Sequence, residues 1–428
     1  MANIPLQNVA SPEEASGDGR NYTPALMSLA VLYFMMGLLT CLNDTLVPFF
    51  KKGFTLSYAE SSLVQFYFFL TYAVMSVPAG KIVERIGYKN GMVAGFSIAA
   101  LGALLFYPAS VIHQYYLFLA ALFVLAVGIV LLQVAANPYI TILGPAQTAS
   151  SRLTLIQGIG SLGTTAAPVF GAHFILSRLD VTGSSSAAVR YPYLGIALVL
   201  LVIAFAVKSL SLPRLKSGGT GGREQEVNVR NVLKFRNLKF GIAGLFFYVG
   251  AEVAVGTFLT NYISEKLHIG ESEANGYVAF YWGGMMAGRF LGSWLLKFLR
   301  PQAVLCCCTC AAMALILLSV NSGSIIAVWT MIGVGLCNSV MFAIIFSLAI
   351  NGLGEYSTLG SGMLSTAIAG GAVISYLQGY LIDHYSWQLS FTLPVICYGY
   401  ILFYAVNGYK AKSKEAADLS PAFIKTEL

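Results

Sequence analysis

The sequence predicts an all-α membrane protein with twelve transmembrane helices arranged as two six-helix halves. Three observations lead to this fold class. The 428-residue chain is 57% hydrophobic and only 10% charged, whereas soluble domains carry about 25% charged residues. Its hydrophobic residues fall into separate blocks, each long enough to cross a hydrocarbon core of about 30 Å. A polar, glycine-rich stretch divides this series of blocks near its middle.

The apolar blocks are expected to be helices. They run continuously apolar without alternation, and only helices and closed barrels satisfy every backbone group inside a bilayer. The predicted spans are 25–50, 58–80, 91–110, 115–141, 152–177, 191–211, 239–264, 274–298, 302–320, 324–350, 358–382 and 387–408. They divide the chain into an N-terminal segment (1–24), a first half (25–211), a linker (212–238), a second half (239–408) and a tail (409–428).

The two halves repeat one another. Gly80-Lys81 follows the second span and Gly288-Arg289 follows the eighth, so both halves place a glycine and a basic residue at an equivalent helix end. The fifth and eleventh spans are both rich in glycine, which permits close helix packing. Two such repeats joined by a linker are typical of secondary transporters, whose binding site lies between the halves near the bilayer midplane.

The distribution of basic residues predicts the orientation in the membrane. With both termini in the cytoplasm, all but five of the 25 Lys and Arg residues lie on the cytoplasmic side. The pI near 8.9 therefore reflects basic residues in the cytoplasmic loops between spans. For this reason we expect no nucleic-acid partner. Residues 1–23 are polar and lack the apolar core of a cleavable signal peptide, so the first span is expected to direct insertion.

Two acids are predicted to lie deep in the membrane. Of the 18 Asp and Glu residues, only Asp44 in the first span and Glu252 in the seventh fall well within apolar blocks. A charge in the bilayer costs about 2.5–3.5 kcal/mol on insertion scales, so such acids are functional by default. Because desolvation favours the neutral carboxyl, either acid could take up a proton or attract a sodium ion. We predict that both couple a cation to transport; a static contact between helices is the alternative.

Charged residues at the ends of the second and eighth spans are candidate gating groups. Glu84 and Arg85 lie at the first of these ends and Arg289 at the second. We expect them to form contacts that break and reform as the halves rock. The alternative is a snorkelling anchor at the membrane interface.

Amides and aromatic rings inside the spans are candidates for binding a hydroxylated substrate, because sugars present hydroxyl groups and an apolar C–H face. The predicted substrate-binding residues are Asn43, Gln133, Asn137, Gln157, Asn261, Asn338 and Tyr281. Gln133 and Gln157 rank highest, since they are expected to face each other across adjacent spans. Buried amides need partners, so a structural contact between helices is an equally good explanation for any one of them.

Neither an enzyme nor a metal site is predicted. The seven cysteines lie in apolar blocks, and the run at 306–310 has no His, Asp or Glu near it. The four histidines are scattered. The sequence contains no catalytic constellation and no nucleotide-binding motif, so we expect the energy for transport to come from an ion or solute gradient.

Several motifs resemble the fucose–proton symporter family of the major facilitator superfamily. They are Leu42-Asn43-Asp44-Thr45-Leu46-Val47-Pro48, Gln133-Val134-Ala135-Ala136-Asn137-Pro138-Tyr139, Leu143-Gly144-Pro145, Arg152-Leu153-Thr154-Leu155-Ile156-Gln157 and Tyr248-Val249-Gly250-Ala251-Glu252-Val253-Ala254-Val255-Gly256. The similarity runs from about residue 25 to residue 405. It implies the facilitator fold in a bacterial inner membrane, a hexose substrate, and no cofactor beyond a coupling proton or sodium ion.

The resemblance also implies roles for single positions. Asp44 matches the family's proton-coupling acid, and Gln157 matches a sugar-contacting glutamine. Gln133 stands where fucose-specific members have Glu, and Gly160 stands where they have a substrate-contacting Asn. Gln at 133 combined with Glu at 252 is more similar to the glucose/galactose transporter branch.

We therefore interpret the sequence as a hexose:cation symporter that imports sugar by alternating access. The expected partners are the sugar and the lipid bilayer, and a monomer is expected because one chain supplies a complete pathway. An exporter or importer of another small polar solute is one alternative. A transporter-shaped membrane sensor is another, although neither the linker nor the tail supplies a signalling domain.

Overall fold

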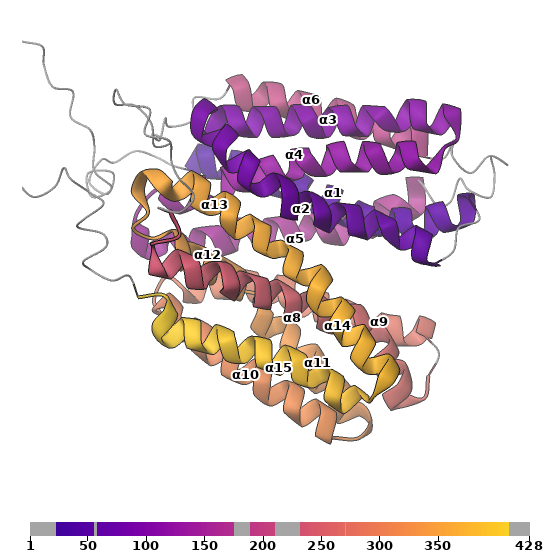
Figure 1. The fold of residues 1–428 in the computed structure, drawn as a ribbon, viewed down its shortest axis with the longest axis vertical. Helices are drawn as coiled ribbons and strands as arrows, with labels where there is room; N and C mark the ends of the chain where they lie inside the picture. Colours follow the sequence, from indigo (N-terminus) through magenta and orange to yellow (C-terminus); the bar gives the residue numbers. More distant parts are fainter. Residues whose placement is uncertain (1–22, 55–57, 175–188, 210–231, 270, 411–428) are drawn as a thin grey trace, which may run out of the picture.

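The structure is a computed structural model that describes residues 23–54, 58–174, 189–209, 232–269 and 271–410. The side chains of residues 43–53, which include Asn43 and Asp44, of residues 58–66 and of several other helical residues lie outside the described part. Within the described ranges the chain forms helices joined by short turns and contains no strand. The predicted all-α class is therefore confirmed (Figure 1).

The first half consists of six long helices that alternate in direction. They are α1 (Thr23–Gly53), α2 (Tyr58–Ile86), α3 (Tyr88–Ile112), α4 (Tyr115–Ile142), α5 (Ala149–Phe174), which is preceded by the short η2 (Ala146–Thr148), and α6 (Arg190–Ser209). Most helix ends fall within a few residues of the predicted spans, because the bilayer thickness fixes the length of an apolar block. The second span is the main exception, since α2 continues through Glu84 and Arg85.

The second half repeats this arrangement, with three spans made of consecutive segments. Its elements are α8 (Arg236–Leu267), α9 (Glu271–Leu295), α10 (Pro301–Asn321), α11 (Ser324–Asn338) with α12 (Met341–Ile350), η5 (Gly354–Tyr356) with α13 (Ser357–Thr366), η6 (Ala367–Ala369) and α14 (Gly370–His384), and α15 (Trp387–Phe403) with η7 (Tyr404–Gly408). Counted this way, the described residues form twelve spans. Eight of them are apolar enough over a sufficient length to cross a membrane.

Within each half, a glycine brings two helices into backbone contact, and the helix pairs are equivalent in the two halves. In the first half, a Cβ added at Gly163 of α5 would collide with the Phe34 carbonyl oxygen of α1. In the second half, a Cβ added at Gly370 would collide with the Phe246 carbonyl oxygen of α8. The predicted use of glycine for close packing is therefore found at matching places in both halves.

The two halves form separate bundles whose axes diverge (Figure 1). We call the end at which α6 finishes and α8 begins the linker end. Helix α2 lies against α13 of the other half, and α5 lies against α9. A Cβ on Gly80 of α2 would lie 3.3 Å from the Thr358 carbonyl oxygen, so the backbones approach closely there.

Hydrogen bonds join the halves at the linker end. The Thr358 hydroxyl donates to the Tyr88 hydroxyl at 2.9 Å. Ser150 and Ser347 share a hydrogen bond of 2.5 Å, and the Ser151 hydroxyl donates to the Ser293 carbonyl oxygen at 2.5 Å. The side chains that make these bonds are all at least nine-tenths buried. The structure thus has its halves closed on each other at the linker end.

Candidate functional site

Glu252 lies in the middle of α8 and is tied to polar groups of its own half. The Arg289 guanidinium of α9 acts electrostatically on its carboxyl group, and the Tyr248 hydroxyl lies within hydrogen-bonding reach one helical turn away. The Tyr248 hydroxyl also donates to the Asn338 carbonyl oxygen at 2.9 Å. A protonated Glu252 could donate to the Tyr248 oxygen, whereas an ionised Glu252 would compete for the Tyr248 proton.

Arg289 connects this acid to the other half of the molecule. One terminal nitrogen of its guanidinium donates to the Ser161 hydroxyl on α5, and the other lies 3.6 Å from the Met285 sulfur. Arg289 lies within α9, which ends at Leu295. The gating role of Arg289 stays a prediction, and its bond to Ser161 does join the two halves.

Three buried polar atoms on α4, α5 and α9 have no hydrogen-bond partner among the described residues. They are the Gln133 Oε1, the Gln157 Oε1 and the Arg289 Nε. Gln133 belongs to α4, Gln157 to the neighbouring α5, and Arg289 to α9 of the other half. The Ser161 hydroxyl, which Arg289 contacts, donates back to the Gln157 carbonyl oxygen at 3.1 Å. Two acceptors and one donor are therefore left for a ligand or water, because unpaired buried polar atoms are costly.

Asn338 and Tyr281 lie in a closed network and not at an open binding surface. The Asn338 amide nitrogen donates to the Tyr281 hydroxyl at 3.1 Å, and its amide oxygen accepts from the Tyr398 hydroxyl at 2.6 Å. Both side chains are 0% exposed. Tyr281 in turn donates to the Glu252 carbonyl oxygen at 3.4 Å. These two residues therefore use their polar groups within the protein and support α8 at Glu252.

The other predicted amides are not brought to this cluster. Asn137 is 2% exposed, and its amide oxygen accepts a hydrogen bond from Tyr33, so it joins α4 to α1. Asn261 is exposed on α8 about 13 Å along the helix axis from Glu252. The predictions for Asn43 and Asp44 concern side chains outside the described part; the α1 backbone passes through both positions.

Gly160 faces α1, which explains why no side chain is found there. A Cβ at this position would lie 3.2 Å from the Tyr33 carbonyl oxygen and close to the Tyr33 ring. A side chain at this position would require Tyr33 to shift by a few tenths of an ångström.

The predicted gating pair lies at the end of α2, and its role as a gate stays a prediction. Arg85 is exposed on the surface of α2. Glu84 is half-buried and acts electrostatically on Tyr88, its neighbour along the chain. At the linker end, the contacts between the halves include hydroxyl groups, which were not predicted, and Gly80, which was predicted to lie at this helix end.

Two contributors to the site were not predicted. Ser161 follows Gln157 by four residues, and this helical spacing could have placed it on the same face. Tyr248 precedes Glu252 by the same interval. Among the described residues, no group of three or more His, Cys, Asp and Glu side chains could hold a metal ion.

Comparisons with known proteins agree with this architecture. The model of the Major Facilitator Superfamily matches residues 29–376. The glucose/galactose transporter of Brucella abortus biovar 1 (strain 9-941) is 46% identical over 412 residues, which cover 95% of this chain and 99% of the relative. The L-fucose-proton symporter of Escherichia coli (strain K12) is 31% identical and covers 94% of this chain and 97% of its own. The crystal structure of the transporter FucP in the outward conformation has a TM-score of 0.83 at 30% identity, covering 90% and 99% of the two chains.

Proposed function

The chain belongs to the Major Facilitator Superfamily, and from this premise we propose that it imports a hexose together with a cation by alternating access. The resemblance inferred from its motifs is confirmed by relatives that are named transporters and symporters of sugars. The same relatives confirm that the chain is a carrier and not an enzyme. Glucose and galactose are the proposed substrates, because the relative with 46% identity is named for them.

The observation that carries the proposal is the set of unpartnered polar atoms shared between the halves. A sugar hydroxyl both donates and accepts hydrogen bonds. The Gln133 and Gln157 oxygens can accept from two hydroxyl groups, while the Arg289 Nε–H can donate to an oxygen of the same ring. A sugar held in this way bridges α4 and α5 of one half to α9 of the other. Its binding would therefore favour arrangements in which these helices stay close.

Coupling to a cation is proposed to use Glu252 and Asp44. Neutralising Glu252 by a proton removes its attraction to Arg289, which frees the guanidinium to strengthen its bonds to Ser161 and the sugar. The position of Asp44 on α1 supports an equivalent role in the first half, since α1 and α8 are the corresponding helices. A proton and a sodium ion are both compatible with these carboxyl groups.

The linker end is proposed to face the cytoplasm, with both termini on that side. The surplus of Lys and Arg near this end supports the assignment. In that orientation the structure is outward-facing, because its halves are closed at the linker end. The similarity to a transporter solved in the outward conformation agrees with it. We further propose that the carrier works as a monomer in a bacterial inner membrane.

Transport into proteoliposomes tests the proposal. Labelled glucose, galactose and fucose are offered with a proton gradient or a sodium gradient, each imposed separately. Glu252→Gln and Asp44→Asn are expected to abolish gradient-driven accumulation while sparing exchange of sugar against sugar. Glu273→Gln, which changes an exposed acid of α9, serves as the matched control. Full accumulation by both site variants would refute the coupling role, and the absence of any hexose uptake by the unmodified protein would refute the substrate class.

A further inference from the structure

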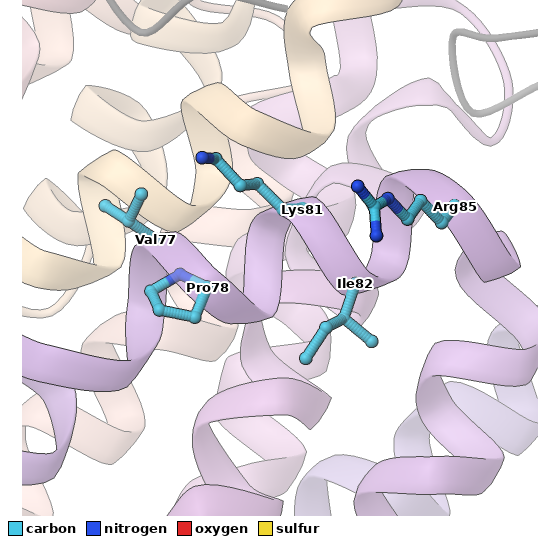
Figure 2. A pocket seen from close by; sticks show the side chains of 5 residues that line it. All are labelled: Val77, Pro78, Lys81, Ile82 and Arg85. Atoms are coloured by element: carbon cyan, nitrogen blue, oxygen red, sulfur yellow. The ribbon is translucent and has the colours of Figure 1, made fainter. Parts of the chain in front are cut away.

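A shallow hollow lies on the surface of α2 near the linker end. It has a volume of about 260 Å³ and is lined by Val77, Pro78, Lys81, Ile82 and Arg85 (Figure 2). These residues recur at helical spacing, so they share one face of α2. The hollow is independent of the sugar site, to which none of its lining residues belongs.

Among the described residues, the two cations of the hollow have no protein partner. Lys81 and Arg85 are exposed, and neither forms a hydrogen bond or ion pair with another residue in the described part of the chain. Other arginines at helix ends are engaged: Arg190 donates to Ser110, and Arg236 donates to the Asn407 carbonyl oxygen. The Lys81 amine and the Arg85 guanidinium extend to the same side of α2 (Figure 2). Two positive charges one helical turn apart are thus available to a single anion.

The hollow also has an apolar part, which lies deeper in the membrane. Helix α2 ends at Ile86, so Arg85 and Lys81 lie about 2 and 8 Å from its end along the axis. Val77 and Pro78 lie about 12–14 Å from the end, at the depth of acyl chains. Ile82 is 42% exposed between these levels. In a bilayer such a surface is covered by hydrocarbon, because an empty space would forfeit dispersion contacts.

We propose that this hollow binds one anionic phospholipid. The lipid phosphate lies between Lys81 and Arg85, and one acyl chain covers Val77, Pro78 and Ile82. An arginine binds phosphate through paired N–H groups, while lysine adds a point charge. Basic pockets at the ends of membrane helices recognise anionic head groups in this way. The apolar floor selects a lipid over free inorganic phosphate.

The lipid would also border the contact between the halves. Gly80, beside Lys81 in sequence, is the residue at which α2 approaches Thr358 of α13. The occupied site therefore adjoins the linker-end closure described above.

Photolabelling of the full-length protein tests this site. The protein is reconstituted in phosphatidylcholine vesicles that contain a photoreactive phosphatidylglycerol, and labelled peptides are identified by mass spectrometry. We expect labelling within residues 77–85. The double variant Lys81→Gln/Arg85→Gln should reduce it about thirtyfold, given the attraction of two basic residues for an anionic surface. The matched control Lys297→Gln/Arg300→Gln removes two exposed cations near the same end of the second half and should leave it unchanged.

Further measurements keep the test decisive. The conservative variant Lys81→Arg should retain labelling, which ties the loss to the positive charge at this position. Three results would overturn the proposal: equal loss of labelling at 77–85 in both double variants, displacement of the lipid by inorganic phosphate, or equal labelling of 77–85 by photoreactive phosphatidylcholine. The first would indicate unspecific surface charge, the second an anion site, and the third an acyl-chain contact without head-group recognition.

Discussion

Removing the hydroxyl contacts at the linker end should shift the protein toward a conformation that is open at that end. Tyr88→Phe removes the hydrogen bond with Thr358, and Ser151→Ala removes the one with the Ser293 carbonyl oxygen. Each buried neutral hydrogen bond contributes about 0.5–1.5 kcal/mol net. The two bonds lie on different helices, so their contributions should add approximately. The double variant should therefore lose about 1–3 kcal/mol of the free energy that favours closure. This loss shifts the equilibrium between the closed and open conformations about 5- to 150-fold toward the open one.

Cysteine labelling measures this shift. A cysteine at Ser361 is introduced into a chain whose seven native cysteines have been replaced, and a water-soluble maleimide is added from the linker side. Ser361 is 0% exposed in α13, near this contact, so its labelling reports opening. The labelling rate should rise by the factors given above, and by less for either single variant.

A control pair separates this effect from the general loss of serine hydroxyls. Ser97→Ala and Ser209→Ala remove hydroxyls that donate only to their own helices, to the Val93 and Phe205 carbonyl oxygens. This pair should leave labelling unchanged. If the double variant is folded and labels no faster than the control pair, the reasoning that these bonds hold the linker end closed is refuted.

Three further predictions follow from packing and hydrogen bonding. Gly370→Ala should lower thermal stability by about 1–3 kcal/mol, because the new methyl group meets the Phe246 carbonyl oxygen, whereas Gly399→Ala, with open space around it, should not. Asn338→Leu should cost about 2–5 kcal/mol in the same unfolding assay, because it leaves the Tyr398 hydroxyl without its acceptor and removes the amide that donates to the Tyr281 hydroxyl; unchanged stability would contradict a supporting role. Gln157→Ala should weaken hexose binding about tenfold in calorimetry with little change in stability, because its Oε1 has no partner to lose; unchanged affinity would remove it from the site.

The helical spans were predictable because membrane thickness sets a physical length. A block of about 20 apolar residues can only be a span, whatever the helices around it do. The breaks between α11 and α12 and between α13 and α14 were not predictable in this way, since they contain no proline and interrupt apolar sequence. Their positions depend on neighbouring helices, which the sequence pattern does not describe.

The site was predictable in its residue types but not in its pairings. Glu252 and Gln157 stood out because charges and amides are rare in apolar blocks. The contact of Arg289 with Ser161 depends on how two helices of different halves are rotated, so sequence spacing could not indicate it. The same uncertainty explains Asn338, whose amide could equally have faced a sugar or the tyrosines that surround it.

The glycine contacts of α1 with α5 and of α8 with α14 also bear on how the molecule can move. With the Phe34 and Phe246 carbonyl oxygens set directly against a neighbouring helix, neither pair can slide or tilt far without a collision of main-chain atoms. Each six-helix half should therefore move as a stiff body, and the joint between the halves should absorb most of the displacement. In such a carrier, a small rotation of the two halves about their interface opens the pathway at one face of the membrane and closes it at the other face.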